Sequence, residues 1–195
     1  MSAREIILKA IKENKPASDL ELPPVSYYPS SMPVDDGVQL FIKNLTDNAA
    51  VVKRIKNSHE ITDLILHQWN EQKHIHAPML PYLHNTPATA DAAATLDIAV
   101  VKANIGVINN GAIWVNDQSL EHRSVAFLTK YLVILIDQQD LVDNLHEAYA
   151  KINPFDFGYG VWISGPSKTG DIEQALVIGA HGPLEVMVLI QSNEH

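Results

Sequence analysis

The chain has no cysteine among its 195 residues. This absence excludes disulfide bonds, thiol nucleophiles and cysteine-ligated iron–sulfur clusters as features of the chain itself. It is also typical of proteins from reducing compartments, where disulfides are rare. Any chemistry must therefore come from hydroxyl, imidazole, carboxylate and backbone groups, and we expect no cofactor to be bound by this chain.

Long apolar runs and basic clusters are missing as well. No stretch approaches the ~20 apolar residues that a membrane-spanning helix needs, and the acid-bearing N-terminal sequence lacks the apolar core of a signal peptide. The formal net charge is −9, and no basic stripe offsets it, so nucleic acid and anionic membranes are poor candidate partners. We expect a cytoplasmic protein, and a homo-oligomer is compatible with the sequence.

The first 34 residues divide into a helix and a proline-rich arm. Ser2 and Glu5 have the spacing of a capping box, and apolar residues then recur at helical intervals, which predicts a helix over residues 3–14. Five prolines between positions 16 and 33 predict an extended arm. We expect this arm to dock on its own domain. The alternative is that it docks on a neighbouring subunit. Residues 35–195 should form a single domain.

Helical patterns alternate with short apolar runs in the rest of the chain, which predicts a layered α/β fold. Asn109-Asn110-Gly111 between two apolar runs predicts a β-hairpin, because the turn needs residues that tolerate positive φ. Helices should begin at Asp36, at Ser58 and after Asp140. Residues 77–95 should form a loop. The remaining strands are expected at residues 49–52, 96–101, 131–136, 160–164 and 184–190.

The segment 164–173, Ser-Gly-Pro-Ser-Lys-Thr-Gly-Asp-Ile-Glu, directly follows the apolar run at 160–163. We expect a helix to begin near Thr169 or Asp171. Free N–H groups at such a helix start, placed at the end of a strand, would bind an anion. Ser167 and Thr169 add hydroxyl donors, and Lys168 adds a positive charge. In the alternative interpretation, Ser167 or Thr169 only caps the helix.

Histidines offer a second set of candidates. His181, between glycines in Gly179-Ala-His-Gly-Pro183, is either an acid–base group near a ligand or a buried residue bonded to a carbonyl. His74 and His76 alternate as a metal pair would, but no third ligand is nearby, so we expect no metal site. Arg123 either reaches an anion or faces solvent.

The segments Gly165-Pro-Ser-Lys-Thr-Gly-Asp-Ile-Glu173 and Val177-Ile-Gly-Ala-His-Gly-Pro183 resemble the C-terminal signature of the LUD-domain family, which includes lactate-utilization protein C. The usual family form is Gly-Pro-Ser-Arg/Lys-Thr-Ala-Asp-Ile-Glu, followed by Gly-Val-His-Gly-Pro. The resemblance implies a fold similar to that of ribose-phosphate isomerase, glucosamine-phosphate deaminase and the CoA transferases. That fold is a three-layer α/β/α arrangement around a mostly parallel sheet.

The resemblance also implies partners. Lactate-utilization protein C accompanies two iron–sulfur subunits that oxidise L-lactate to pyruvate, and the clusters would reside on those subunits because this chain has no cysteine. One segment departs from the family, whose usual Ala-Glu-Thr-Gly-Thr is matched here by residues 108–112. Gly111 is kept, but Asn109 and Asn110 replace the acid and the threonine. Asparagine forms hydrogen bonds but does not act as a carboxylate base.

Three functions are compatible with these residues. The first is an accessory or ligand-binding subunit of a lactate-utilization system. The second is a stand-alone enzyme acting on a phosphorylated metabolite or CoA ester, with His181 or Glu173 as the acid–base group. The third is a non-catalytic interaction module that docks through the proline-rich arm. For the first function, the residues expected around a small anionic ligand are Gly165, Ser167, Lys168, Thr169 and Asp171, with Asn109, Asn110, Gly111, Arg123, His181 and Gly182 completing the site.

Overall fold

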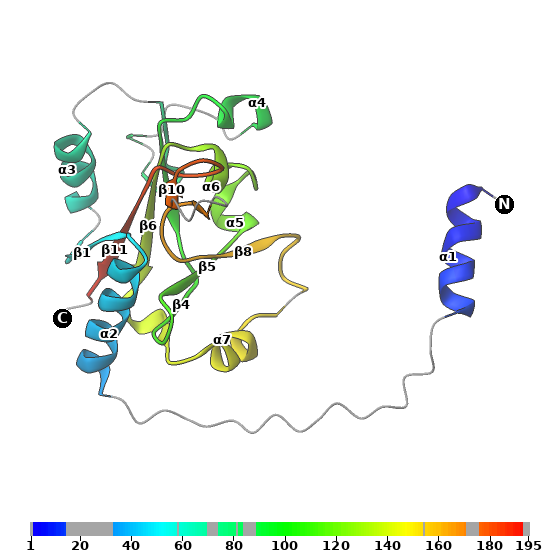
Figure 1. Cartoon of the computed structure of the whole chain (residues 1–195). Helices are drawn as coiled ribbons and strands as arrows, with labels where there is room; N and C mark the ends of the chain where they lie inside the picture. The colour runs from blue at the N-terminus through cyan, green and yellow to red at the C-terminus, as the bar shows by residue number, and fades with distance from the viewer. Residues whose placement is uncertain are drawn as a thin grey trace.

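A parallel sheet of five strands, in the order β1-β11-β6-β3-β2, forms the centre of the protein (Figure 1). The computed structural model describes residues 2–14, 33–57, 59–69, 74–80, 82–83, 89–153, 155–170 and 176–192. The strands of the central sheet are β1 (Val51–Ile55), β2 (Ile75–His76), β3 (Ile98–Lys102), β6 (Tyr131–Asp137) and β11 (Glu185–Gln191). The five inner residues of β6 and of β11 are all buried, as expected for strands covered on both faces.

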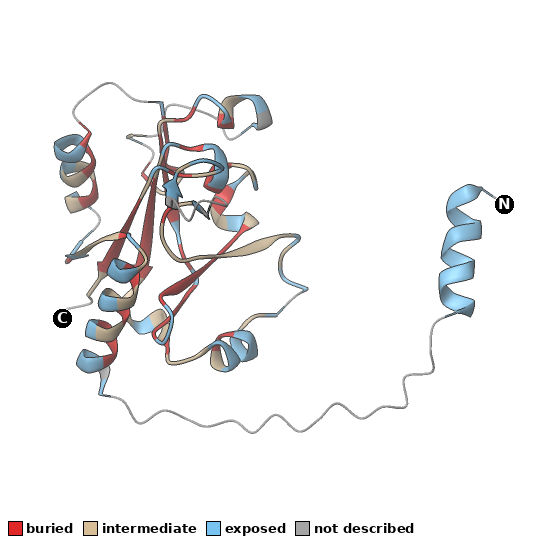
Figure 2. Cartoon of the chain, viewed as in Figure 1, coloured by how far each residue is buried: buried red, intermediate tan, exposed pale blue. Residues whose placement is uncertain are grey.

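Each face of the parallel sheet packs on its own hydrophobic layer. On one face, Val133 and Leu189 pack with Ile61 and Ile65 of α3 (His59–Gln68). On the opposite face, the core includes Phe41 of α2 (Val34–Asp47), together with residues of a second sheet. The burial pattern in Figure 2 follows these layers. The predicted α/β architecture with a mostly parallel sheet and flanking helices is therefore confirmed.

The second sheet has the order β7-β4-β5-β8 and is mostly antiparallel. Its strands are β4 (Ile105–Val107), β5 (Ala112–Asn116), β7 (Leu141–Val142) and β8 (Gly160–Ile163). The predicted hairpin around Asn109–Gly111 joins β4 to β5, and Gly111 has a φ of 68°. Asn110 supports the turn because its Oδ1 accepts a hydrogen bond from the Ala112 N–H at 3.0 Å.

Short elements complete the described structure. They are α4 (Ala90–Ala93), α5 (Asp117–Leu120), α6 (Val125–Leu128), the 3-10 helix η1 (Gln138–Asp140), α7 (Leu145–Lys151), β9 (Lys168–Gly170) and β10 (Leu176–Ile178). Helix α4, capped by the Thr89 hydroxyl, corrects the expected unbroken loop at 77–95. Pro33 is the N-cap of α2 and Asp36 lies in its first turn, so the expected cap at Asp36 is wrong.

The N-terminal helix α1 (Ala3–Glu13) forms as predicted. Its capping box is present, since the Ser2 hydroxyl accepts from the Glu5 N–H and the Glu5 carboxylate accepts from the Ser2 N–H. Residues 15–32, which make up most of the proline-rich arm, lie outside the described residues, so the extended course of the arm and its docking stay predictions. In the part of the chain described, no helix combines the length and apolar character needed to cross a membrane.

Gly160 in β8 tests the packing of the second sheet. A Cβ at this position would overlap the ring of Trp114, which is 9% exposed on the neighbouring strand. We expect Gly160→Ala to lower the free energy of unfolding by about 1–3 kcal/mol in urea denaturation, as overpacking does. In a Trp114→Leu background, the same substitution should cost clearly less, because the ring that it meets is gone. An equal cost in both backgrounds would show that the ring contact is not the cause.

Candidate functional site

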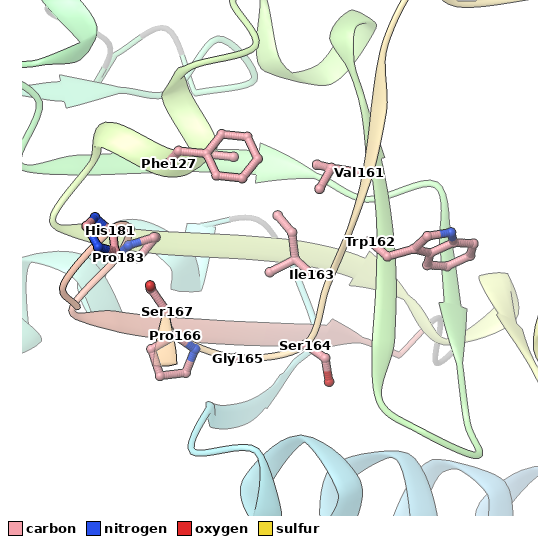
Figure 3. A pocket seen from close by; sticks show the side chains of 12 residues that line it. Phe127, Val161, Trp162, Ile163, Ser164, Gly165, Pro166, Ser167, His181 and Pro183 are labelled. Atoms are coloured by element: carbon pink, nitrogen blue, oxygen red, sulfur yellow. The ribbon is translucent and has the colours of Figure 1, made fainter. Parts of the chain in front are cut away.

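A cavity of about 360 Å³ opens beside the loop that follows β8 (Figure 3). Three separate parts of the chain line it: residues 161–167, residues 181–183 before β11, and residues 126–127 of α6. These parts are brought together only by the tertiary fold. Four residues expected at the ligand meet here, namely Gly165, Ser167, His181 and Gly182.

The two walls of the cavity differ in chemistry. Figure 3 shows the side chains of Phe127, Val161 and Ile163 turned toward one another on one side. Ser167 and His181 lie on the other side, and His181 is exposed to solvent. A cavity with an apolar wall facing a few polar groups is the usual form of a small-molecule site.

The polar wall depends on the backbone conformation of Gly165. Its φ of +101° lies in a region that favours glycine, and a Cβ here would collide with the carbonyl oxygen of Asn48. The Asn48 amide also donates a hydrogen bond of 2.8 Å to the Ser164 hydroxyl. Asn48 follows α2 directly, so the end of this helix fixes the position of the loop.

The same contacts place the Asn109–Gly111 turn behind the loop. The carbonyl oxygen of Asn110 accepts hydrogen bonds from Ser164 Oγ at 3.2 Å and from Asn48 Nδ2 at 3.3 Å. A Cβ on Gly111 would lie 3.3 Å from Ser164 Oγ. In Figure 3, the Ser164 side chain points away from the cavity. The turn thus supports the loop, and it is not among the described residues that line the cavity.

The helix start expected at Thr169 is wrong, because residues 168–170 form β9 and pair antiparallel with β10. The alternative start at Asp171 lies outside the described residues. The Ser167 N–H donates to the Pro183 carbonyl at 3.3 Å, so this amide is already used. Within the described ranges, the backbone N–H groups of Gly165, His181 and Gly182 form no hydrogen bond with the protein. The donors available to a ligand therefore come from two loops, without a helix dipole.

The remaining predicted residues lie elsewhere. Lys168 and Thr169 are exposed on β9, beside the cavity but not among its lining residues. Arg123 borders a different hollow of about 240 Å³, with its guanidinium carbon 6.0 Å from the centre of the Tyr159 ring. Burial raises the pKa of Tyr159, and the charge of Arg123 opposes this change. Asp171 and Glu173 lie outside the described residues.

The histidine pair gives no support for a metal. His74 is exposed and its Nδ1 lies 3.2 Å from the Thr95 carbonyl, whereas His76 is fully buried with Nε2 3.8 Å from a Glu121 carboxylate oxygen. Among the residues that the structure describes, no three histidine or acidic side chains are placed to hold an ion.

The cavity lies at the amino ends of the central strands, since Pro183 precedes β11 and Phe127 precedes β6. Sequence reasoning placed the loop at the carboxyl end of a strand of an open sheet, where ligands usually bind. The strand in question, β8, belongs to the second sheet, so that rule does not apply. Sequence reasoning also missed Asn48 and the apolar wall, because nothing near them in the sequence indicates the contact.

The carboxyl ends of the central strands carry a different set of charges. Lys102 Nζ lies 3.0 Å from Asp137 Oδ2 at the ends of β3 and β6. Burial raises the pKa of the nearby Asp140, and the charge of Asp137 raises it further, while Lys102 and Lys151 lower it. Carboxylates and lysines therefore balance one another at this edge.

The raised pKa of Asp140 predicts a pH-dependent effect on stability. When the folded-state pKa exceeds the unfolded one, the folded state binds more protons, and stability falls as pH rises through the folded pKa. We therefore expect Asp140→Asn to raise the melting temperature at neutral pH, with the gain vanishing as pH falls below the ordinary aspartate range. Thermal unfolding at a series of pH values checks this. Asp63→Asn on the exposed side of α3 is the matched control, and equal gains for both variants would contradict the prediction.

Comparisons with known proteins agree with this fold. The family model of the LUD domain matches residues 85–191. Lactate utilization protein C of Shouchella clausii (strain KSM-K16) is 29% identical over 106 residues, which cover 51% of this chain and 46% of that protein. The protein of the same name from Geobacillus thermodenitrificans (strain NG80-2) is 26% identical over 106 residues, covering 51% and 44%. The match thus spans a little under half the length of these relatives.

A solved structure supports the fold. The crystal structure of a DUF162 family protein from Deinococcus radiodurans aligns with a TM-score of 0.62 and 11% sequence identity, covering 82% of this chain and 99% of that one. Identity this low bears on the fold alone. The family-model match, by contrast, covers more than half of the chain and includes both loops of the cavity. On this basis the chain belongs to the LUD-domain family.

Proposed function

We propose that the protein is a ligand-binding, accessory subunit of a lactate-utilization system, and that the cavity beside residues 164–167 holds a small carboxylate. The relatives named lactate utilization protein C support the biological setting. In this proposal, redox chemistry belongs to partner subunits that carry iron–sulfur clusters, because a chain without cysteine offers no thiolate ligands for one.

One observation carries the choice of ligand. Among the residues that the structure describes, the backbone N–H groups of Gly165, His181 and Gly182 form no hydrogen bond, and all three residues line the cavity together with Ser167. A carboxylate accepts several hydrogen bonds at once, and charge-assisted bonds of this kind are stronger than neutral ones. The apolar part of the ligand would then pack against the Phe127 and Ile163 side of the cavity.

The size of the cavity restricts the ligand further. Its volume of about 360 Å³ lies at the lower end of the range for small-molecule sites. A molecule as small as lactate would leave room for water, and ordered water bridges polar groups at little cost. A larger carboxylate would fill the same space directly. Ligand titrations should therefore include both lactate-sized and larger carboxylates.

Lys168 contributes to the proposal through its charge. It is exposed on β9 next to Ser167, so it attracts an anion across solvent without lining the site. Such attraction is screened over about 8 Å at physiological salt. Replacing Lys168 with alanine should therefore weaken binding mainly at low ionic strength.

Ligand titration tests the site itself. We expect calorimetry to detect binding of lactate, pyruvate or a larger carboxylate to the wild-type chain. Ser167→Ala should weaken that binding by about 2- to 12-fold, the range for one hydrogen bond of about 0.5–1.5 kcal/mol. Ile163→Asp should abolish it, because a second carboxylate would then face the bound one.

His59→Ala provides the matched control, since His59 is exposed at the start of α3, near the carboxyl end of β1. It should bind as the wild type does. If Ser167→Ala and Ile163→Asp, shown by circular dichroism to be folded, bind every tested anion as the wild type does, the cavity is not the site. Turnover of a phosphorylated metabolite or CoA ester by the purified chain would favour the enzyme alternative.

A further inference from the structure

Helix α1 has an apolar stripe that no described residue covers. Ile6, Ile7 and Ile11 lie on this stripe and are 54%, 59% and 61% exposed. None of the helix is buried, as its uniform colour in Figure 2 shows. A helix of 11 residues is only marginally stable alone in water, even with a good cap. The stripe therefore needs a partner surface.

Exposed apolar side chains also lie near the cavity described above, and one of them, Phe127, lines it. Four side chains that are 40–50% exposed form what we call the mouth patch: Phe127, Leu128, Val177 and Leu184. Ile178 is exposed as well, but it follows Val177 on β10 and therefore points to the opposite face of that strand. The four residues of the patch come from α6, β10 and the residue before β11. Leu184 lies against Gly179, which follows β10, and Phe127 lines the cavity with Pro183. Exposed apolar side chains around a hollow form the kind of groove that receives an amphipathic helix.

Charge also favours contact between α1 and the rest of the chain. The helix carries Arg4, Lys9 and Lys12 against Glu5 and Glu13, whereas the whole chain has a net charge of −9. A helix with an excess of positive charge is attracted to a body of opposite sign.

The length of the segment between α1 and α2 favours docking of the helix on its own chain over docking on a second copy. Residues 14–33 separate α1 from α2, and a segment of this length spans at most roughly 70 Å. A domain of this size has a diameter of about 40 Å. The helix can therefore reach any face of its own domain, where tethering gives an effective concentration of about millimolar order. Docking on a second copy would compete poorly at micromolar protein.

We propose that α1 docks through Ile6, Ile7 and Ile11 on the mouth patch of its own chain, across the opening of the cavity. A second exposed apolar surface is the face of α7, with Leu145 and Tyr149. The Tyr149 hydroxyl there already accepts a hydrogen bond from Trp162 at 3.1 Å, and neither residue borders the 360 Å³ cavity. This inference does not depend on the ligand proposed above.

Paramagnetic labelling of the full chain tests the docking without any ligand. Because the chain has no cysteine, Lys9→Cys creates a single thiol on the polar side of α1 and leaves the stripe intact. A nitroxide on this thiol should broaden the amide signals of residues 127–128, 177 and 184 in the same chain. In the control, Ile7→Asp and Ile11→Asp are added to the labelled chain, and these signals should recover their intensity while the rest of the spectrum is unchanged.

Three results would overturn the proposal. The first is equal intensity at the mouth patch in the labelled chain and in the control. The second is broadening centred on residues 145–149. The third is full broadening in a mixture of two kinds of chain. One kind carries the nitroxide and no isotope, and the other carries the isotope and no nitroxide. Broadening in this mixture would place the contact between copies. Carboxylate binding can fail without affecting this outcome, and docking can fail without affecting carboxylate binding.

Discussion

The burial of β6 and β11 on both faces is the constraint on which the rest of the structure depends. Their inner residues, Leu132–Ile136 and Val186–Ile190, expose almost nothing to solvent, so each face of these strands must meet an apolar layer. Helix α3 supplies one layer, and α2 with the second sheet supplies the other. The segments that lead into these strands, α6 and residues 181–183, are thereby brought together at one edge. The cavity forms where β8 of the second sheet meets them.

Local physics explains which elements could be predicted. The capping box of α1, the Asn-Gly turn and the continuous apolar strands are each specified by residues near one another in sequence. The error at residues 168–170 has the opposite origin. Threonine and glycine there are compatible with a helix start, but pairing with β10 uses the same backbone groups in a ladder. The partner strand β10 lies several residues further along the chain, beyond residues that the structure does not describe. Local propensity does not reveal a pairing of this kind.

The candidate site shows the same division. Gly165, Ser167, His181 and Gly182 belong to two sequence signatures, so a family resemblance could place them together, and the cavity does so. Asn48 and Phe127 belong to no such signature. Asn48 contributes a carbonyl that excludes any side chain at position 165, and Phe127 contributes an apolar surface. Both roles depend on where the residue lies in the folded chain. Neither residue belongs to a sequence motif, so neither role could be predicted from the sequence.

The Asn109–Gly111 turn supports the loop without using a carboxylate. Its contacts with the loop use the carbonyl oxygen of Asn110 and the glycine conformation of Gly111, neither of which requires a carboxylate. The Asn110 side chain adds a bond within the turn, to the Ala112 amide. The turn therefore supports the loop, and Asn109 and Asn110 supply no carboxylate that could accept a proton at neutral pH. Support for the loop without a carboxylate at this turn is compatible with the accessory role that we propose.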